Sequence, residues 1–201
     1  MKAQIMTNES TDCALVIGAS SAIAQALISQ LIQDPKLSHI YAVSRQILSA
    51  DNAAYANPKV VLMQCDNSEQ QIIDNLSRVA PNKPIRLVFI CNGMLHCHHH
   101  LSPITPEKRL EDINPEHLMA IMQSNLLVPL MWVKHLVSLF SRKAPAQMVI
   151  FSARVGSIED NRLGGWYSYR SSKAALNMAL KTLSIEWQRR YPKRCVVALH
   201  P

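Results

Sequence analysis

Short runs of consecutive apolar residues alternate along the chain with longer segments in which apolar residues recur every three or four positions. The short runs are rich in Val and Ile and do not alternate with polar residues, which is typical of parallel strands buried on both faces. The longer segments have the period of amphipathic helices. Strands are predicted at 13–18, 85–93, 147–153 and 194–200, with weaker candidates at 39–45 and 59–66, and helices at 21–34, 68–80, 115–140 and 168–190.

This alternation of strand and helix predicts an α/β fold: a doubly wound parallel sheet of the Rossmann type with helices on both faces. No repeat, linker or low-complexity tract divides residues 1–201, so a single domain is expected. Ligands bind such sheets beyond the carboxyl ends of the strands. The residues that follow each apolar run are therefore the first candidates for a functional site.

Composition argues against several other classes of protein. The balance of 21 Lys+Arg against 14 Asp+Glu gives a net charge of +7, but the basic residues are scattered with few aromatic residues among them, so no nucleic-acid partner is expected. No apolar run reaches the roughly 18 residues of a membrane helix, and the N-terminus lacks the apolar segment of a secretory signal. These features predict a cytoplasmic protein without a membrane partner.

The segment HCHHH at 96–100 brings histidine and cysteine together without predicting a metal site. Contiguous residues cannot all face one ion, and no second cluster with ligand spacing occurs elsewhere in the sequence. We therefore expect no metal, and interpret the segment as a loop near the rim of the site.

The segment GASSAIA, residues 18–24, leaves the first predicted strand and opens a helix. Gly18 permits a tight turn, and the free N–H groups at the start of the helix favour a phosphate. Ala22 and Ala24 stand where the GxGxxG pattern would have glycine. An ordinary strand-to-helix turn is therefore the alternative interpretation.

Two charged residues follow the next predicted strands. Arg45 stands where an acidic residue would bind the ribose hydroxyls of NAD, and an arginine there, beside Ser44, favours a 2′-phosphate instead. The alternative is a solvated surface arginine. Asp66 could accept a hydrogen bond from an adenine amino group, but with Ser68 it could equally form a helix N-cap, and the two roles are compatible.

Tyr169 and Lys173 lie four residues apart, and therefore on one face of the predicted helix, whereas Tyr167 does not share that face with Lys173. The face continues through Leu176 and Leu180, so it should point inward. The charge of Lys173 is predicted to lower the pKa of Tyr169 from its reference of about 10 towards neutrality. Tyr169 would then be a general acid or base; the alternative is a buried tyrosine beside a snorkelling lysine.

Asn125 lies on an apolar helical stripe, where a polar side chain needs partners. Pro129 follows four residues later and cannot donate to the carbonyl of residue 125. We expect a kinked helix that presents the Asn125 side chain and a free carbonyl to an ordered water. A tolerated proline kink without function is the alternative.

Together these residues resemble the short-chain dehydrogenase/reductase family across essentially the whole chain. The family's motifs occur in its order: GASSAIA, CDNS at 65–68, CNG at 91–93, Asn125, and Tyr169-x-x-x-Lys173. The segments NGMLH, PEKRLEDINPEHL, SARVGSI and GGWYSYRSSKAALNM are most similar to the C-factor and Sniffer-type carbonyl reductase branch.

The resemblance implies an NAD(P)-dependent oxidoreductase that transfers a hydride between NADP(H) and a small carbonyl or alcohol substrate. Tyr169 would be the general acid and base, Lys173 would lower its pKa and hold the nicotinamide ribose, and Asn125 would hold a water that connects Lys173 to solvent. NADP(H) is preferred because of Arg45, with NAD(H) as the alternative. The residues implied to bind the cofactor are Gly18, Ser20, Ser21 and Ile23 at the pyrophosphate, Arg45 at the 2′-phosphate, Asp66 at the adenine, Asn92 and Gly93 at the adenosine ribose, and Tyr169 with Lys173.

The sequence departs from the family in three places. Ala153 replaces the serine that polarises the substrate; Ser157 is the candidate to replace it, and Ser152 is the alternative. The methyl groups of Ala22 and Ala24 would lie near the pyrophosphate. The sequence also stops at ALHP, where the family continues with a substrate loop and a last strand.

These departures motivate a second hypothesis, a nucleotide-binding regulatory or signalling protein of the same fold with little or no turnover. The family resemblance further implies a homodimer.

Overall fold

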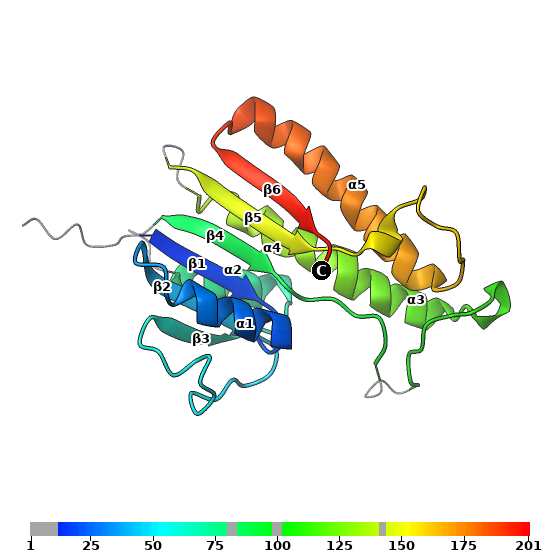
Figure 1. The fold of residues 1–201 in the computed structure, drawn as a ribbon, viewed down its shortest axis with the longest axis horizontal. Coiled ribbons are helices and arrows are strands. Elements are labelled where there is room, and N and C mark those ends of the chain that lie inside the picture. Colours follow the sequence, from blue (N-terminus) through cyan, green and yellow to red (C-terminus); the bar gives the residue numbers. More distant parts are fainter. Residues whose placement is uncertain (1–11, 80–83, 98–101, 141–143) are drawn as a thin grey trace, which may run out of the picture.

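Six parallel strands form one sheet in the computed structural model, which describes residues 12–79, 84–97, 102–140 and 144–201 (Figure 1). The strand order is β3-β2-β1-β4-β5-β6, and each neighbouring pair is parallel. The predicted doubly wound sheet is confirmed, including both weaker strand candidates. The strands are β1 (Asp12–Ile17), β2 (Leu37–Ser44), β3 (Val60–Gln64), β4 (Ile85–Ile90), β5 (Ala146–Phe151) and β6 (Arg194–Leu199).

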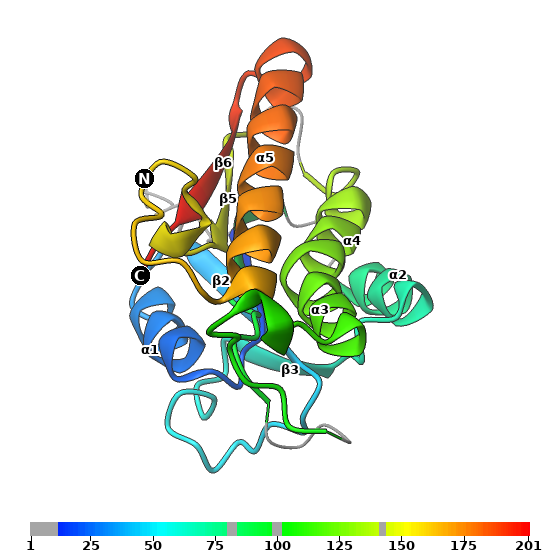
Figure 2. The same ribbon diagram turned by 90° about the vertical axis from the view of Figure 1, so that its right-hand side faces the viewer.

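Helices lie on both faces of the sheet (Figure 2). Helix α1 covers one face, where Ala24 and Ile28 pack with residues of β1 and β2. Helices α2, α4 and α5 cover the other face and contribute Ile72, Trp132 and Leu176 to a second core cluster. The helical elements are α1 (Ala22–Leu31), α2 (Glu69–Arg78), η1 (Leu110–Asp112), α3 (Pro115–Met122), η2 (Gln123–Leu127), α4 (Val128–Leu136), η3 (Arg154–Gly156) and α5 (Tyr167–Arg190).

The helix predicted over 115–140 runs without a break from Pro115 to Leu136, and its middle segment, η2, is a π-helix rather than an α-helix. Val128 N–H donates to the carbonyl of Gln123, five residues back. This wider turn lies directly before Pro129, which has no N–H to donate. The irregularity predicted from the proline therefore takes the form of a π segment, and such segments are frequent at functional sites.

Strand β1 lies between β2 and β4, so the chain crosses over at β1 to build the second half of the sheet. Loops that leave β1 and β4 at their carboxyl ends diverge at such a point and leave a crevice for a ligand. At the edge of the sheet, Val197 and Leu199 of β6 are each 41% exposed. No helix among the described residues has the length and apolar character needed to cross a bilayer.

Candidate functional site

At the carboxyl ends of β1 and β4, the backbone segments that follow the two strands lie in close contact. Gly18 adopts a φ of +80°, and a Cβ on it would lie 2.8 Å from the N atom of Asn92. Glycine is therefore required both by its backbone conformation and by the close approach of the neighbouring loop. The N–H groups of Gly18 and Ala19 both donate to Val43 O, which closes the turn after β1.

Helix α1 begins directly after this turn. Ser21 is the N-cap, and its Oγ accepts a hydrogen bond from Ala24 N at 3.2 Å. The N–H groups of the first helical residues, Ala22 and Ile23, have no carbonyl one turn earlier to bond. Ser20 and Ile23 are exposed beside them, so the site predicted for a pyrophosphate is at the surface and accessible.

The two alanines of this segment point in different directions. Ala24 is fully buried in the core cluster with β1 and β2, whereas Ala22 is exposed. Of the two added methyl groups predicted to lie near the pyrophosphate, that of Ala24 packs against the sheet instead.

Asn92, in the loop after β4, has a buried side-chain oxygen that accepts no hydrogen bond from the described residues. Its Nδ2 donates to Ser124 O at 3.2 Å, while its Oδ1 has no partner among the described residues. Buried polar atoms of this kind normally have a partner. An acceptor beside Gly18 fits the hydroxyl groups of a ribose.

Arg45 and Asp66 lie at the carboxyl ends of β2 and β3. Arg45 is exposed and forms no ion pair within the described part of the chain. Asp66 Oδ1 accepts a hydrogen bond from Ser68 N at 2.7 Å, and Ser68 is the N-cap of α2. Hydrogen bonds from Ser68 hold the pKa of Asp66 below its usual value. The capping interpretation therefore applies to Ser68, which Asp66 orients, and the exposed Asp66 carboxylate can still accept another hydrogen bond.

Tyr169 and Lys173 share the inward face of α5, as predicted. Lys173 is 3% exposed and Leu176 is fully buried on the same face. The Nζ atom of Lys173 donates to Phe151 O at 2.8 Å and lies 5.8 Å from the centroid of the Tyr169 ring. The tyrosine and lysine are thus brought together at the carboxyl end of β5.

The predicted lowering of the Tyr169 pKa is wrong for this structure. Burial raises the pKa of Tyr169 above its ordinary value of 10.0, and burial lowers the pKa of Lys173 to about 8. The ammonium is directed to a backbone carbonyl of β5, so its charge does not offset the desolvation of the phenol.

Asn125, in the π segment η2, is fully buried and joins three parts of the site. Its Oδ1 accepts from Met94 N at 2.6 Å, and its Nδ2 donates to Met94 O at 2.9 Å and to Ser172 Oγ at 3.0 Å. Ser172 Oγ donates in turn to Tyr169 O at 2.8 Å. A Cβ on Gly93 would lie 3.3 Å from Lys173 Nζ and 3.5 Å from Asn125 Oδ1. The loop after β4, the π segment and α5 therefore meet around the lysine.

The serines near Ala153 differ in the hydrogen bonds that they make. Ser152 is buried, and its Oγ donates to Asn177 Oδ1 at 2.6 Å. Ser157 Oγ accepts from Asp160 N at 3.3 Å, which leaves its own hydrogen to donate. Gly156 between them packs on α5, because its Cβ would lie 2.9 Å from the carbonyl carbon of Lys173. The donor of Ser152 is thus already used, and that of Ser157 is not.

Several members of this network were not identified from the sequence. The carbonyl of Phe151 and the backbone of Met94 carry no residue-type signal, because any residue could supply those atoms. Ser172 could have been found, since it lies one turn after Tyr169 in the sequence that carries the pair.

The histidine-rich segment is only partly described. His96 is exposed, Cys97 pairs with Ile104 in an isolated bridge, and residues 98–100 lie outside the described residues. No group of three or more potential metal ligands occurs in the described part of the chain.

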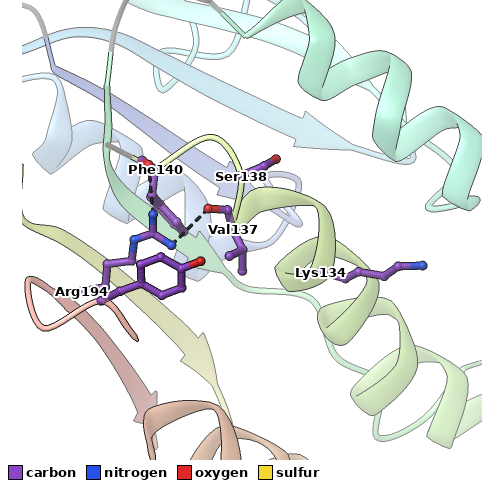
Figure 3. A pocket seen from close by; sticks show the side chains of 6 residues that line it. Lys134, Val137, Ser138, Phe140 and Arg194 are labelled. Carbon is purple, nitrogen blue, oxygen red and sulfur yellow. Dashed lines mark hydrogen bonds between the residues drawn. The ribbon is translucent and has the colours of Figure 1, made fainter. Parts of the chain in front are cut away.

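A hollow of about 420 Å³ lies at the opposite end of the strands, where β6 begins (Figure 3). The guanidinium of Arg194 donates to Val137 O and Phe140 O, both at 3.1 Å, and lies 3.8 Å from the centroid of the Tyr191 ring. The side chain of Lys134 points away from the guanidinium of Arg194 (Figure 3). Because Val137 is the C-cap of α4, Arg194 acts there as a helix cap, and we assign this hollow a structural role.

Residues 12–197 match the family model described as short chain dehydrogenase. Among curated proteins, the benzil reductase ((S)-benzoin forming) of Bacillus subtilis is 24% identical over 176 residues, which are 86% of this chain and 66% of that relative. The chain thus spans slightly less than two thirds of the length of this relative.

Solved structures share the fold. The carbonyl reductase Sniffer of D. melanogaster matches with a TM-score of 0.77 at 23% identity, over 94% of this chain and 79% of that one. A short-chain dehydrogenase/reductase from Burkholderia multivorans with bound NADP matches with a TM-score of 0.76 at 21% identity, over 95% of this chain and 79% of that one. The Sniffer structure belongs to the branch that the sequence motifs indicated.

Proposed function

Because this chain belongs to the short-chain dehydrogenase family, we propose that it is an NADP(H)-dependent carbonyl reductase in which Tyr169 is the general acid and base. The observation that carries the proposal is the buried ammonium of Lys173. It lies on the same helix face as Tyr169 and beside the fully buried Asn125. Lysine is almost never fully buried unless its charge is paired, and no carboxylate pairs with Lys173 among the described residues.

The residues around the crevice fit a dinucleotide. The unpartnered Oδ1 of Asn92, the free N–H groups at the start of α1 and the close approach at Gly18 would hold a ribose and a pyrophosphate. Ser20, Ser21 and Ile23 lie at that pyrophosphate position.

Arg45 favours NADP(H) over NAD(H). It lies at the carboxyl end of β2, where a 2′-phosphate would be bound, and Asp66 would accept from the adenine. The NADP in the B. multivorans protein supports this choice. NAD(H) is the weaker alternative, because the position that would bind its ribose hydroxyls carries Arg45 and not an acidic residue.

The bound cofactor would supply a hydride to the carbonyl carbon of the substrate. Tyr169 would donate its phenolic proton to the carbonyl oxygen as that oxygen gains charge. The ammonium of Lys173 would stabilise the phenolate that remains once Tyr169 has given up its proton. Asn125 would hold the Met94 loop against Ser172 of α5 and keep a water that connects Lys173 to solvent.

Ser157 would replace the family serine at Ala153. Its O–H is available to donate to the developing oxyanion, whereas the O–H of Ser152 is bound to Asn177. Loss of one such donor can cost roughly 10²- to 10³-fold in kcat. Ser157→Ala should therefore reduce turnover, with Ser152→Ala as the comparison.

The test is NADPH oxidation over a panel of aldehydes, ketones and diketones, with benzil included because of the B. subtilis relative. Tyr169→Phe should lower kcat by about 10²- to 10⁴-fold, since the general acid is lost. Tyr167→Phe is the matched control, because Tyr167 is two residues earlier and off the Lys173 face. Equal rates in Tyr169→Phe and Tyr167→Phe would remove Tyr169 from the mechanism.

Cofactor choice is tested separately by titration, following transfer of tryptophan fluorescence to NADPH or NADH. Arg45→Ala should weaken NADPH binding by about 10- to 100-fold, the effect of losing hydrogen bonds to a charged group, and leave NADH binding unchanged. Tight NADPH binding without turnover on any carbonyl would instead support a nucleotide-binding regulatory role.

We also propose a homodimer, as the family resemblance implies. Sedimentation equilibrium of the wild type would test this, and a monomeric wild type would contradict it. A cytoplasmic location stays a prediction of the sequence.

A further inference from the structure

The first turn of α5, which carries Tyr169, begins in an unusual way. Its N-cap is Trp166, with φ 56° and ψ 43°, and this residue makes no side-chain capping hydrogen bond. Gly164 and Gly165 before it also have positive φ values, +65° and +66°. A bulky residue in the left-handed region is strained and persists only where the surroundings hold it.

Glu107 supplies the missing cap from a distant part of the chain. It lies 61 residues before Ser168, in the segment that precedes η1, and is 5% exposed. Its carboxylate accepts hydrogen bonds from both the N–H and the Oγ of Ser168. Its own carbonyl accepts from Trp166 N at 2.5 Å. One glutamate thus satisfies donors of two residues at the start of the helix.

The charge of Glu107 has no cationic side chain as a partner within the described residues. It lies instead at the positive end of a helix of 24 residues. A buried carboxylate needs such compensation, because isolated buried charges are costly. The backbone of Gly165 is also packed closely against Glu107, because a Cβ on Gly165 would lie 3.2 Å from Glu107 O.

The hydrogen bonds from Ser168 and Trp166 to Glu107, here called the Glu107 clamp, lie directly beside the proposed general acid. Ser168 is fully buried and immediately precedes Tyr169, while Trp166 packs edge-on against the Tyr169 ring with 6.3 Å between centroids. We propose that Glu107 is a positioning residue: it caps α5 and thereby sets the place of the Tyr169 hydroxyl. This inference rests on the proposed reductase function for its kinetic part only.

The experiment compares Glu107→Ala, Glu107→Gln and the control Glu111→Ala, which alters an exposed glutamate four residues later. Amide hydrogen exchange across residues 166–170 measures the clamp without any substrate. Exchange should accelerate by about 10-fold or more in Glu107→Ala, since hydrogen bonds to a charged group are lost, and stay unchanged in Glu111→Ala.

Kinetics on an active substrate then measure positioning. Glu107→Ala should lower kcat by about 10- to 100-fold with KM for NADPH unchanged, because a small displacement of the reacting group costs that much. Glu107→Gln, whose amide can both accept from Ser168 N and donate to Ser168 Oγ, should restore most of the loss. Should Glu107→Ala fail to fold, Ser168→Ala removes one of the two carboxylate contacts and should show a smaller change in the same direction.

Unchanged exchange in Glu107→Ala, or faster exchange with unchanged kcat, would overturn the proposal. A fall in NADPH affinity equal to the fall in kcat would overturn it too, since that pattern indicates general disorder of the site. A wild type with no turnover would defeat the proposed function, and the exchange rates alone would then decide whether Glu107 holds the helix end.

Discussion

The two ends of α5 each lie beside a buried cation, and the two cations are held in opposite ways. At the N-terminal end, Lys173 is 3% exposed and donates to one backbone carbonyl, that of Phe151. At the C-terminal end, Arg194 is 9% exposed, donates to the carbonyl of Val137, the C-cap of α4, and to that of Phe140 beyond it, and stacks on Tyr191.

The difference shows that burial of a charge does not by itself mark a functional site. Arg194 has a planar group that donates to the carbonyls of Val137 and Phe140 and whose face is covered by aromatic rings, so it stabilises the fold. Lys173 has three donors and a pKa lowered by burial to about 8, so its charge is poorly compensated. Lys173, whose buried charge lowers the stability of the fold, is therefore the better candidate for a catalytic role than Arg194.

The largest contrast is expected from removing each cation in turn, beginning with Lys173. Lys173→Met should lower kcat by at least about 100-fold, because proton transfer by Tyr169 loses its support. The free energy of unfolding should not fall, because a poorly compensated charge is replaced by an apolar side chain. Steady-state kinetics and urea unfolding measure the two effects, and full turnover in Lys173→Met would break the comparison.

Arg194→Met should show the reverse pattern. Loss of two hydrogen bonds from a charged group should reduce the free energy of unfolding by about 2 to 4 kcal/mol, with kcat unchanged in the folded protein. Arg190→Met is the matched control, since Arg190 is an exposed arginine nearby whose pairing with Glu186 is worth about 0.5 kcal/mol or less. Equal unfolding midpoints for the two variants would contradict a capping role for Arg194.

The pH dependence of stability should also separate the two cations. The pKa of Lys173 is about 8 in the folded protein and about 10.4 in the unfolded chain. Between these values the unfolded chain binds a proton that the folded protein does not, so the free energy of unfolding rises with pH. From pH 7 to pH 9.5 the gain from this group should be about 2 kcal/mol, and below the folded pKa the burial cost is constant.

Urea unfolding at pH 7 and pH 9.5 tests whether the free energy of unfolding rises with pH. Lys173→Met should lose the gain, whereas Arg194→Met should keep it, because arginine does not titrate in this range. The same slope in Lys173→Met and in the wild type would show that other groups cause the dependence.

The smallest predicted effect concerns the space around Lys173. The Cβ of Gly93→Ala would lie 3.3 Å from Lys173 Nζ, so the ammonium must shift, and kcat should fall by about 10-fold with little change in stability. Gly164→Ala is the contrasting control: it meets no atom within 4 Å but has φ +65°, so it should cost about 1 kcal/mol of stability through strain. Steady-state kinetics and urea unfolding separate the two, and a larger loss of kcat in Gly164→Ala would contradict this account.

The sequence by itself determined the strands, the helices and their order, because hydrophobic period and turn residues are local properties of the chain. It also determined which tyrosine accompanies Lys173, since residues four apart must share a helix face. The need for glycine at residue 18 followed from the same local logic and is met by its φ of +80°.

Only the tertiary structure decided which atoms these side chains contact and in which direction their pKa values shift. The sequence predicted a lowered pKa for Tyr169, and the opposite shift arises because burial desolvates the phenol. Lys173 Nζ meanwhile donates to the carbonyl of Phe151, which lies in another element. The cap of α5 by Glu107, the unpartnered Oδ1 of Asn92 and the use of Arg194 as a helix cap likewise join residues far apart in the chain. Such contacts depend on how distant segments pack and exclude water, and a local sequence pattern does not contain that information.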